Sequence, residues 1–273
     1  MILLTRKPKK NIQKYKQYAD KIQFIESFDL LNCVPDIVIN LAGEGIADRR
    51  WSTNRKLILR DSRIGITNRL ADRLKGLGAS PKTVISGSAV GYYGTEKKGI
   101  CVEKMPPGDD FSANMCRDWE DSAKYLAGKT TELYHLRIGI VMGRPGGFIG
   151  RLEVPFFLGL GGVLGDGQQM MSWIHRDDLI AMVLWLLRER PPVGVYNATS
   201  PKPASNETFT NLFAKAIKRP AFLRIPEVPM RLLFGDLADL LFKGQAVYPK
   251  RALDQGFVFQ YADLEEALNN LFR

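Results

Sequence analysis

The residues best suited to chemistry lie in one glycine- and serine-rich segment, Val84–Gly94. Its β-branched start predicts a strand, and Ser86, Gly87 and Ser88 then stand at the carboxyl end of that strand. Open α/β sheets bind ligands at this end of their strands. Small side chains there let a flat ligand lie against the backbone, and a serine hydroxyl can polarise a carbonyl group. The same residues also fit a plain strand followed by a glycine-rich turn.

Several other side chains could move a proton or attack a substrate near that strand end. Tyr92 and Tyr93 follow closely in sequence, and either could point at a cleft or pack over the strand end. His175 has an ordinary pKa suited to acid–base work, but a histidine just before a predicted helix also serves as a cap or a packing group. Cys116 has no base next to it in sequence, so we interpret it as a buried, inert thiol.

Strand-like and helix-like segments alternate along the first half of the chain, which predicts a parallel sheet with crossover helices. The fold class is therefore α/β, with a doubly wound parallel sheet. Its expected strands and helices cover residues 36–41, 52–75, 84–88, 112–126 and 133–142.

The pattern changes after Gly143. An Asp-Gly turn between apolar flanks predicts a hairpin over residues 164–174. A helix over 177–190 and a strand over 194–198 follow, and short proline-punctuated helices complete the chain. We predict that residues 151–273 form mainly a smaller lobe over the sheet edge, with 177–200 returning to the first domain, residues 1–150.

Composition limits the class of protein. Of 273 residues, 45% are hydrophobic and 25% charged, as in an ordinary globular protein, and no apolar run approaches the roughly 20 residues that span a bilayer. The first residues lack the apolar core of a signal peptide. Three scattered cysteines show neither metal-ligand spacing nor a paired framework. We predict a cytoplasmic protein with no metal site and no membrane association.

The net charge of +10 raises the question of a nucleic-acid partner. The basic residues alternate with apolar ones at helical spacing, and neither interleaved aromatic residues nor a recognition module accompanies them. A solvated basic face explains this pattern, and a positive rim that attracts an anionic cofactor or substrate is the alternative. We predict no nucleic-acid binding.

Further segments give the chain a family resemblance. They are Asn40–Gly43, Gly43–Trp51, Trp173–Asp178, Tyr196–Pro201 and Pro249–Arg251. In order and spacing, together with the Ser88 strand, they resemble the extended short-chain dehydrogenases/reductases. Within that group the chain is similar to the atypical epimerase family, the sugar nucleotide epimerase subgroup of NAD(P)-dependent epimerase/dehydratase-like proteins.

The resemblance implies a Rossmann-like dinucleotide-binding domain and an oxidoreductase or epimerase acting on a small polar or nucleotide-sugar substrate, in a monomer or homodimer. It places Ser88 in the role of the family's catalytic serine, there to orient a substrate carbonyl. The residues that it implies for the cofactor cleft are Asn40, Leu41, Ala42, Gly43, Ser86, Gly87, Arg137, Gly139 and Val141.

The start of the chain departs from the family. Met1–Arg6 matches the family's second strand, so the first strand, its glycine-rich turn and the first helix, about thirty residues, have no counterpart. Either the true start lies upstream or the polypeptide binds a dinucleotide poorly. Gly143–Gly150 imitates the turn, but its spacing is irregular and Pro145 removes a donor N–H. Its family position instead borders the nicotinamide and the substrate.

The catalytic helix departs as well. Family members carry Tyr-x-x-x-Lys, whose tyrosine moves a proton and whose lysine lowers the tyrosine pKa. Here Ser112 takes the tyrosine position and Cys116 the lysine position, and neither can do that work. A non-enzymatic dinucleotide sensor therefore stays open as an alternative, and the missing first strand leaves a truncated, inactive chain open as another.

Arg6 and Lys7 follow the family's second strand, with no acidic residue beside them. An acidic residue at this place binds the ribose 2′-hydroxyl of NAD, whereas a basic one accommodates the 2′-phosphate of NADP. The pair predicts NADP in preference to NAD, and a surface basic turn is the alternative.

Overall fold

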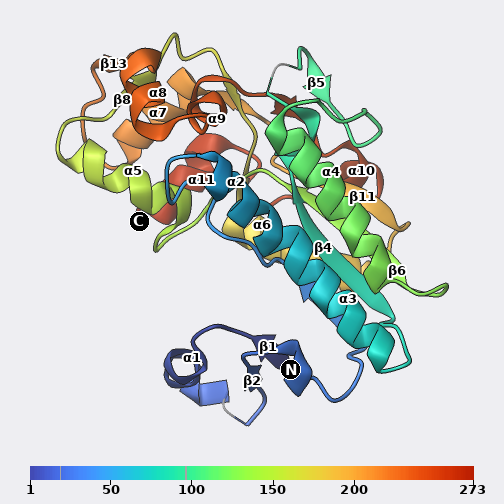
Figure 1. The fold of residues 1–273 in the computed structure, drawn as a ribbon. Helices are drawn as coiled ribbons and strands as arrows, with labels where there is room; N and C mark the ends of the chain where they lie inside the picture. Colours follow the sequence, from blue (N-terminus) through green and yellow to red (C-terminus); the bar gives the residue numbers. More distant parts are fainter. Residues whose placement is uncertain (19, 96) are drawn as a thin grey trace.

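A four-stranded, fully parallel sheet forms the centre of the computed structural model, which describes residues 1–18, 20–95 and 97–273. Its strand order is β11-β6-β4-β3 (Figure 1). The strands are β3 (Ile37–Asn40), β4 (Thr83–Ala89), β6 (Glu132–Ile138) and β11 (Gly194–Ala198). The predicted parallel α/β class, a doubly wound Rossmann-like sheet, is confirmed.

Helices cover both faces of this sheet, because successive strand residues point to opposite sides. Val84 packs under α3 (Ile66–Gly76) and α4 (Phe111–Ala123), whereas the next residue, Ile85, packs under α6 (Arg176–Glu189). Both side chains are fully buried, so β4 is the central, two-sided strand that its apolar run predicts.

The helix expected over residues 52–75 is interrupted. Ser52 caps α2 (Thr53–Arg60) by accepting a hydrogen bond from the Arg55 N–H. A π-helical turn, η3 (Asp61–Gly65), separates α2 from α3. The wider turn shifts the helical register, and single π turns of this kind occur frequently at functional sites.

The first strands stand apart from the central sheet. β1 (Ile2–Leu4) and β2 (Gln23–Ile25) form a parallel pair of their own, below the main body in Figure 1 with α1 (Pro8–Lys14). Within the described residues β3 pairs with β4 alone, so it is an edge strand of the central sheet. The Ile39 side chain of β3 is 47% exposed. The edge of β3 that faces away from β4 therefore lacks a ladder partner in the part of the chain described.

A further hydrophobic core lies in the second half of the chain. The phenylalanines of α5 (Gly147–Phe157) and α7 (Asn206–Ala216) pack together there with α11 (Leu264–Leu271). The remaining elements are β5 (Ile100–Cys101), β7 (Ile140–Met142), β8 (Gly162–Leu164), β9 (Met170–Met171), β10 (Trp173–His175), β12 (Ala204–Ser205), β13 (Leu223–Ile225), α8 (Glu227–Phe234), α9 (Ala238–Phe242), β14 (Ala246–Val247) and α10 (Lys250–Asp254).

The predicted hairpin over residues 164–174 is wrong. The chain does turn at Gly167, but β8 pairs in parallel with β13, and β9 pairs antiparallel with β12. β10 joins β7 in parallel. The two flanks are too short to hold a hairpin by themselves, so distant strands supply their hydrogen bonds.

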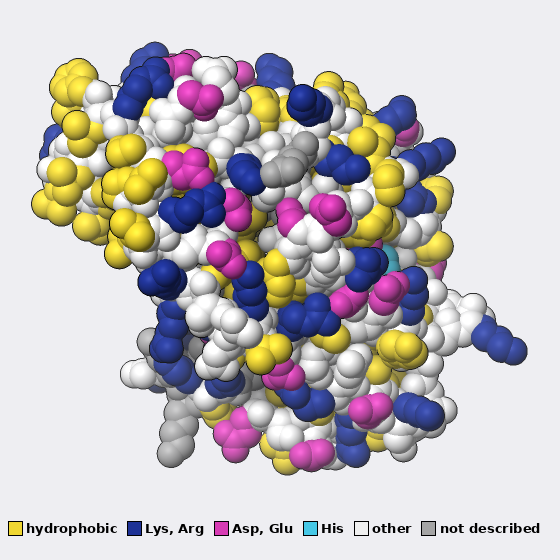
Figure 2. Space-filling view, turned by 45° about the horizontal axis from the view of Figure 1, so that its top comes forward, with side chains coloured by type: hydrophobic (Ala, Val, Ile, Leu, Met, Phe, Trp, Pro, Cys, Tyr) yellow, Lys and Arg dark blue, Asp and Glu magenta, His cyan; other side chains and the backbone are white. Residues whose placement is uncertain are grey.

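Charges of both signs are mixed on the surface. On the face shown in Figure 2, Lys and Arg side chains alternate with Asp and Glu rather than forming one continuous basic stripe. No helix among the described residues combines the length and the apolar character that a bilayer crossing needs.

Candidate functional site

Two hollows open at the carboxyl ends of the strands. The first, about 650 Å³, lies beyond β1 and β3 and is bordered by the π turn. The second, about 530 Å³, lies beyond β4, β6 and β7. Arg6 and Glu44 line the first hollow, and Ser88 lines the second. The rest of the second wall is mostly apolar, with Met115, Phe148, Met170, Met171, Leu240 and Leu241 among its residues.

The loop that leaves β3, residues 43–51, runs beside both hollows. Asn40 shapes its start, because the side-chain oxygen accepts the Ala42 N–H and the amide donates to the Thr67 hydroxyl at 2.8 Å. The Asn40 side chain is buried and lines neither hollow, so its observed role is to hold the loop.

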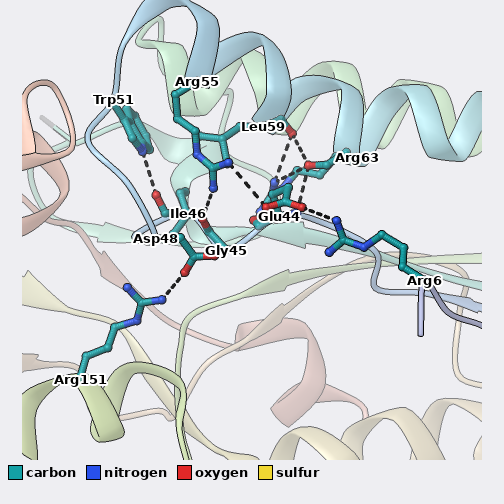
Figure 3. A network of polar contacts seen from close by, with 11 residues as sticks. Arg6, Glu44, Gly45, Ile46, Asp48, Trp51, Arg55, Leu59, Arg63 and Arg151 are labelled. Atoms are coloured by element: carbon teal, nitrogen blue, oxygen red, sulfur yellow. Dashed lines mark hydrogen bonds and ion pairs between the residues drawn. The ribbon is translucent and has the colours of Figure 1, made fainter. Parts of the chain in front are cut away.

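Three arginines surround Glu44 in this loop (Figure 3). Arg6 donates to the Glu44 carboxylate at 2.8 Å, and Arg55 lies 3.5 Å from its other oxygen. Arg63 donates to the Glu44 backbone carbonyl at 3.0 Å, and the Ser62 hydroxyl accepts the Glu44 N–H. The hydrogen bond and charge of Arg6 lower the pKa of the Glu44 carboxyl. The loop is thus fixed at Glu44 by the π turn behind it.

A fourth arginine holds the other end of the 43–51 loop. Arg151 of α5 donates to the Ala47 carbonyl and to the Asp48 carboxylate. The Trp51 indole N–H donates to the Ile46 carbonyl at 2.8 Å and closes the loop on itself. The contacts of Arg151 tie the loop to α5.

Ser88 is the best-placed of the predicted catalytic residues, but its hydroxyl hydrogen is engaged. The hydroxyl donates to the Glu120 carboxylate at 2.7 Å, and Arg137 donates to both oxygens of the same carboxylate at 2.8 and 2.9 Å. A hydroxyl has one hydrogen and two lone pairs. In this arrangement the hydroxyl hydrogen is held by Glu120 and is not offered to a substrate carbonyl, while the oxygen can still accept a hydrogen bond at the second hollow, which Ser88 lines.

Arg137 lies behind the strand end rather than in either hollow. Its side chain is 3% exposed, and its guanidinium stacks 3.3 Å from the Tyr92 ring centre and donates to the Tyr93 hydroxyl. Burial by itself lowers the pKa of Arg137, but the hydrogen bonds and charge of Glu120 outweigh it and raise the pKa. Its charge is used inside the protein, so its predicted place in the cofactor cleft is not supported.

The two tyrosines belong to this buried network. The Tyr93 hydroxyl donates to the Asn197 side-chain oxygen at 2.7 Å, and burial raises the pKa of Tyr93 to about 12. The Tyr92 ring stacks on the Arg137 guanidinium. The Tyr92 and Tyr93 rings meet edge to face. Neither ring lines the second hollow, and Tyr93 instead lines a separate one with Gly94 and Asp110. In this structure both tyrosines contact Arg137.

His175 caps a helix. Its Nδ1 accepts the Asp177 N–H at the start of α6, and its ring lies 4.0 Å from that of Tyr261. The residue is completely buried and outside both hollows, and burial lowers its pKa. The hypothesis of a catalytic histidine is not supported by this position.

Ser112 and Cys116, which replace the family's tyrosine and lysine, both line the second hollow. Burial raises the pKa of the Cys116 thiol to about 12, so a thiolate is disfavoured. Gly139 also lines it, and a Cβ there would lie 2.5 Å from the Ser172 carbonyl oxygen. Only glycine fits at that step between β6 and β7.

The predicted cofactor residues divide into those in the hollows and those outside. The residues that line the first hollow are Arg6, Ala42 and Gly43, and those that line the second are Ser88, Gly139 and Val141. The residues that line neither are Lys7, Asn40, Leu41, Ser86, Gly87 and Arg137. Ser86 is fully buried and donates to the Gly87 carbonyl.

Glu44 and Arg63 are not among the site residues predicted from the sequence. Both lie in segments interpreted only as part of the family resemblance or as a solvated basic face. Arg63 is in fact partly buried, because the π turn places it beside the 43–51 loop, where it donates to the Glu44 carbonyl. The sequence signal that could have indicated them is a glycine-containing loop, residues 43–51, followed directly by a basic helix.

Comparison with known proteins identifies the family. Residues 20–199 match the model of the NAD dependent epimerase/dehydratase family, and residues 225–271 match a domain of unknown function, DUF1731. The chain belongs to the NAD dependent epimerase/dehydratase family. An Arabidopsis thaliana protein, the chloroplastic homologue of epimerase family protein SDR39U1, is 36% identical over 92% of this chain and 73% of its own length. Epimerase family protein Mb2239 of Mycobacterium bovis is 38% identical over 85% and 77%.

Solved structures agree with this assignment. Human epimerase family protein SDR39U1 (isoform 2), crystallised with NADPH, superposes with a TM-score of 0.85 at 32% identity, covering 95% of this chain and 93% of that one. UDP-glucuronic acid 4-epimerase of Bacillus cereus, in complex with NAD, superposes at 0.73 with 20% identity, covering 96% and 83%. The second similarity shows the shared fold alone.

Proposed function

We propose that this protein is an NADP(H)-dependent oxidoreductase or epimerase that acts on a small substrate bearing a hydroxyl or carbonyl group. One observation carries the proposal: two hollows lie at one edge of the parallel sheet, with Arg6 at one and Ser88 at the other. A dinucleotide has two nucleosides to place, and this edge is where α/β sheets bind them. The similar human protein that was crystallised with NADPH supports the choice of cofactor.

Arg6 is the residue that distinguishes NADP from NAD in this proposal. Its side chain is 87% exposed at the rim of the first hollow, where a 2′-phosphate can reach it. Its present partner, Glu44, would have to give way to the phosphate. Because exposed ion pairs contribute little, on the order of 0–1 kcal/mol, that exchange is energetically accessible.

Ser88 orients the reacting group in the second hollow. With its hydrogen held by Glu120, the hydroxyl accepts a hydrogen bond from a substrate hydroxyl and so favours the alcohol form as ligand. A nicotinamide bound here would supply or accept the hydride. The substrate's hydroxyl proton would move along its hydrogen bond to Ser88 as the Ser88 proton moves to Glu120, and back again in the reverse reaction. The apolar walls around Met170 and Phe148 exclude water from that step. They also favour a small substrate over a bulky, polar nucleotide sugar.

The cofactor assignment is tested by calorimetric titration with NADPH and NADH. We expect tighter binding of NADPH, and we expect Arg6→Gln to remove most of the preference. Equal affinity for the two, or no binding of either, would overturn it.

The role of Ser88 is tested by turnover on a panel of carbonyl compounds, alcohols and sugar nucleotides. Ser88→Ala should lower turnover about a hundredfold through loss of orientation. Ser86→Ala is the matched control, since it removes a buried hydroxyl two residues away that lines neither hollow. Unchanged turnover in Ser88→Ala would exclude the role.

A dinucleotide sensor is the second candidate. It is favoured by Ser112 and Cys116 in the second hollow, where the family's proton donor and its lysine are absent from the aligned positions. NADPH binding without turnover on the whole substrate panel would support the sensor.

We keep the cytoplasm as the proposed compartment, because all three cysteines are free.

A further inference from the structure

The π turn presents Arg63 to the 43–51 loop. Arg63 donates to the Leu59 carbonyl and the Ser62 hydroxyl at 3.2 Å, and to the Glu44 carbonyl at 3.0 Å. Its guanidinium also lies 5.4 Å from the centre of the Trp119 ring. Every hydrogen-bond acceptor here is a neutral oxygen, so these contacts hold the side chain in place without neutralising its charge.

The charge of Arg63 has no carboxylate partner among the ion pairs of the described residues, unlike Arg6, Arg55, Arg137 and Arg151, which each have one. The neighbouring Arg55 is itself buried, and its Nε has no hydrogen-bond partner. Burial lowers the pKa of the Arg63 guanidinium. A partly desolvated cation without a counter-charge gains strongly from an anion placed beside it.

The position of Arg63 is at the boundary of the two hollows. Ser62 lines the first hollow and Arg63 lines the second. Gly43, which lines the first hollow, lies close to Arg63: a Cβ at Gly43 would be 3.0 Å from the Arg63 guanidinium carbon. A ligand that occupies both hollows must therefore pass within reach of Arg63. Figure 3 shows the side chain behind Glu44 at this point of the loop.

We propose that Arg63 binds the diphosphate bridge of the dinucleotide, with Gly43 leaving room for the contact. This inference rests on the proposed function, because it takes the two hollows as the sites of the two nucleosides. In a dinucleotide the diphosphate is the charged group between those nucleosides, so it falls at the boundary where Arg63 stands. Arg6 and Arg63 then bind different phosphates of the same ligand.

The test compares two ligands that differ in the diphosphate. NADPH carries it, whereas adenosine 2′-monophosphate carries only the phosphate assigned to Arg6. Calorimetry on Arg63→Gln should show NADPH affinity falling about ten- to a hundredfold, the value of a hydrogen bond to a charged group, with adenosine 2′-monophosphate affinity unchanged. Arg6→Gln should weaken both ligands.

Two further variants separate charge from loop structure. Arg60→Gln removes a cation three residues earlier, which pairs with Asp118 and lines neither hollow, and should leave both affinities unchanged. Arg63→Lys keeps the charge and should retain more NADPH affinity than Arg63→Gln. Thermal unfolding of each variant checks that it is folded.

Three outcomes would overturn the assignment of Arg63. They are unchanged NADPH affinity in folded Arg63→Gln, an equal loss for both ligands, and a loss in substrate KM with NADPH affinity intact. The equal loss would mean that Arg63 acts through the loop. Failure of the wild-type protein to bind NADPH would instead overturn the proposed function, and this inference with it.

Discussion

Two arginine–carboxylate pairs in this protein share their chemistry and differ in burial. In the pair behind the β4 and β6 strand ends, the Arg137 and Glu120 side chains are 3% and 10% exposed. In the pair at the first hollow, the Arg6 and Glu44 side chains are 87% and 25% exposed. Both salt bridges span 2.8 Å, so distance does not distinguish them.

Burial decides what each pair can do. A buried charge cannot lose its partner without a large desolvation cost, so Arg137 and Glu120 act as a fixed frame for Ser88. An exposed charge can exchange its partner for water or a ligand at little cost. The Arg6–Glu44 pair is therefore the one that an incoming phosphate can open. Removing one partner from each pair tests this difference directly.

The largest effect is expected from Glu120→Ala. The substitution leaves the Arg137 guanidinium buried without its counter-charge, and we expect a loss of about 3–5 kcal/mol in the free energy of unfolding. Chemical denaturation measures it. A loss no greater than that of Glu44→Ala would mean that water or another group satisfies Arg137, and would abolish the distinction between the two pairs.

A smaller effect is expected from Tyr93→Phe, within the same buried network. It removes the donor to Asn197 and an acceptor for Arg137, and should cost about 1–2 kcal/mol in the free energy of unfolding. Denaturation at neutral pH checks this value. An unchanged free energy of unfolding would show that the two hydrogen bonds of the Tyr93 hydroxyl do not stabilise the folded protein.

The same tyrosine predicts an alkaline dependence of stability. Because burial raises the pKa of Tyr93 from 10.0 to about 12, the unfolded chain ionises first. Its contribution is fully present below pH 10 and is lost as the pH rises toward 12. Stability of the wild-type protein should fall more steeply over that window than stability of Tyr93→Phe. Parallel curves would contradict the assignment.

The smallest effect on stability is expected from Glu44→Gln. It should change the free energy of unfolding by about 0–1 kcal/mol, as for exposed ion pairs, and raise NADPH affinity several-fold by freeing Arg6. The pKa of Glu44 is lowered by Arg6, so the pair stabilises the protein above pH 4.5 and that contribution is lost as the pH falls further. Weaker NADPH binding in this variant would show that Glu44 assists the cofactor.

Much of the fold was predictable because its signals are local. The apolar runs at 36–41 and 194–198 correspond to β3 and β11, since a run of β-branched residues suits a buried parallel strand. The helix over 112–126 corresponds to α4 and the short turn after it. The hairpin at residues 164–174 failed for the opposite reason, because its partners β12 and β13 are distant in sequence.

The candidate site was predictable only in part. Ser88 at a strand end follows from small residues after a β-branched run, and it does line the second hollow. The direction of its hydrogen depends on Glu120, 32 residues later, which no local pattern relates to it. The helical pattern over 52–75 likewise contains no sign of the π turn that carries Arg63.

The amino-acid sequence by itself determined the parallel α/β class, the family resemblance and the place of Ser88, because periodicity and motif order are properties of neighbouring residues. Only the tertiary structure decided which charges are neutralised and which face a hollow. Arg6 and Glu44 lie 38 residues apart, and Arg137 and Glu120 lie 17 apart. Their partners and their burial are set by how the chain returns on itself, and that is what separates a structural arginine from one that can meet a phosphate.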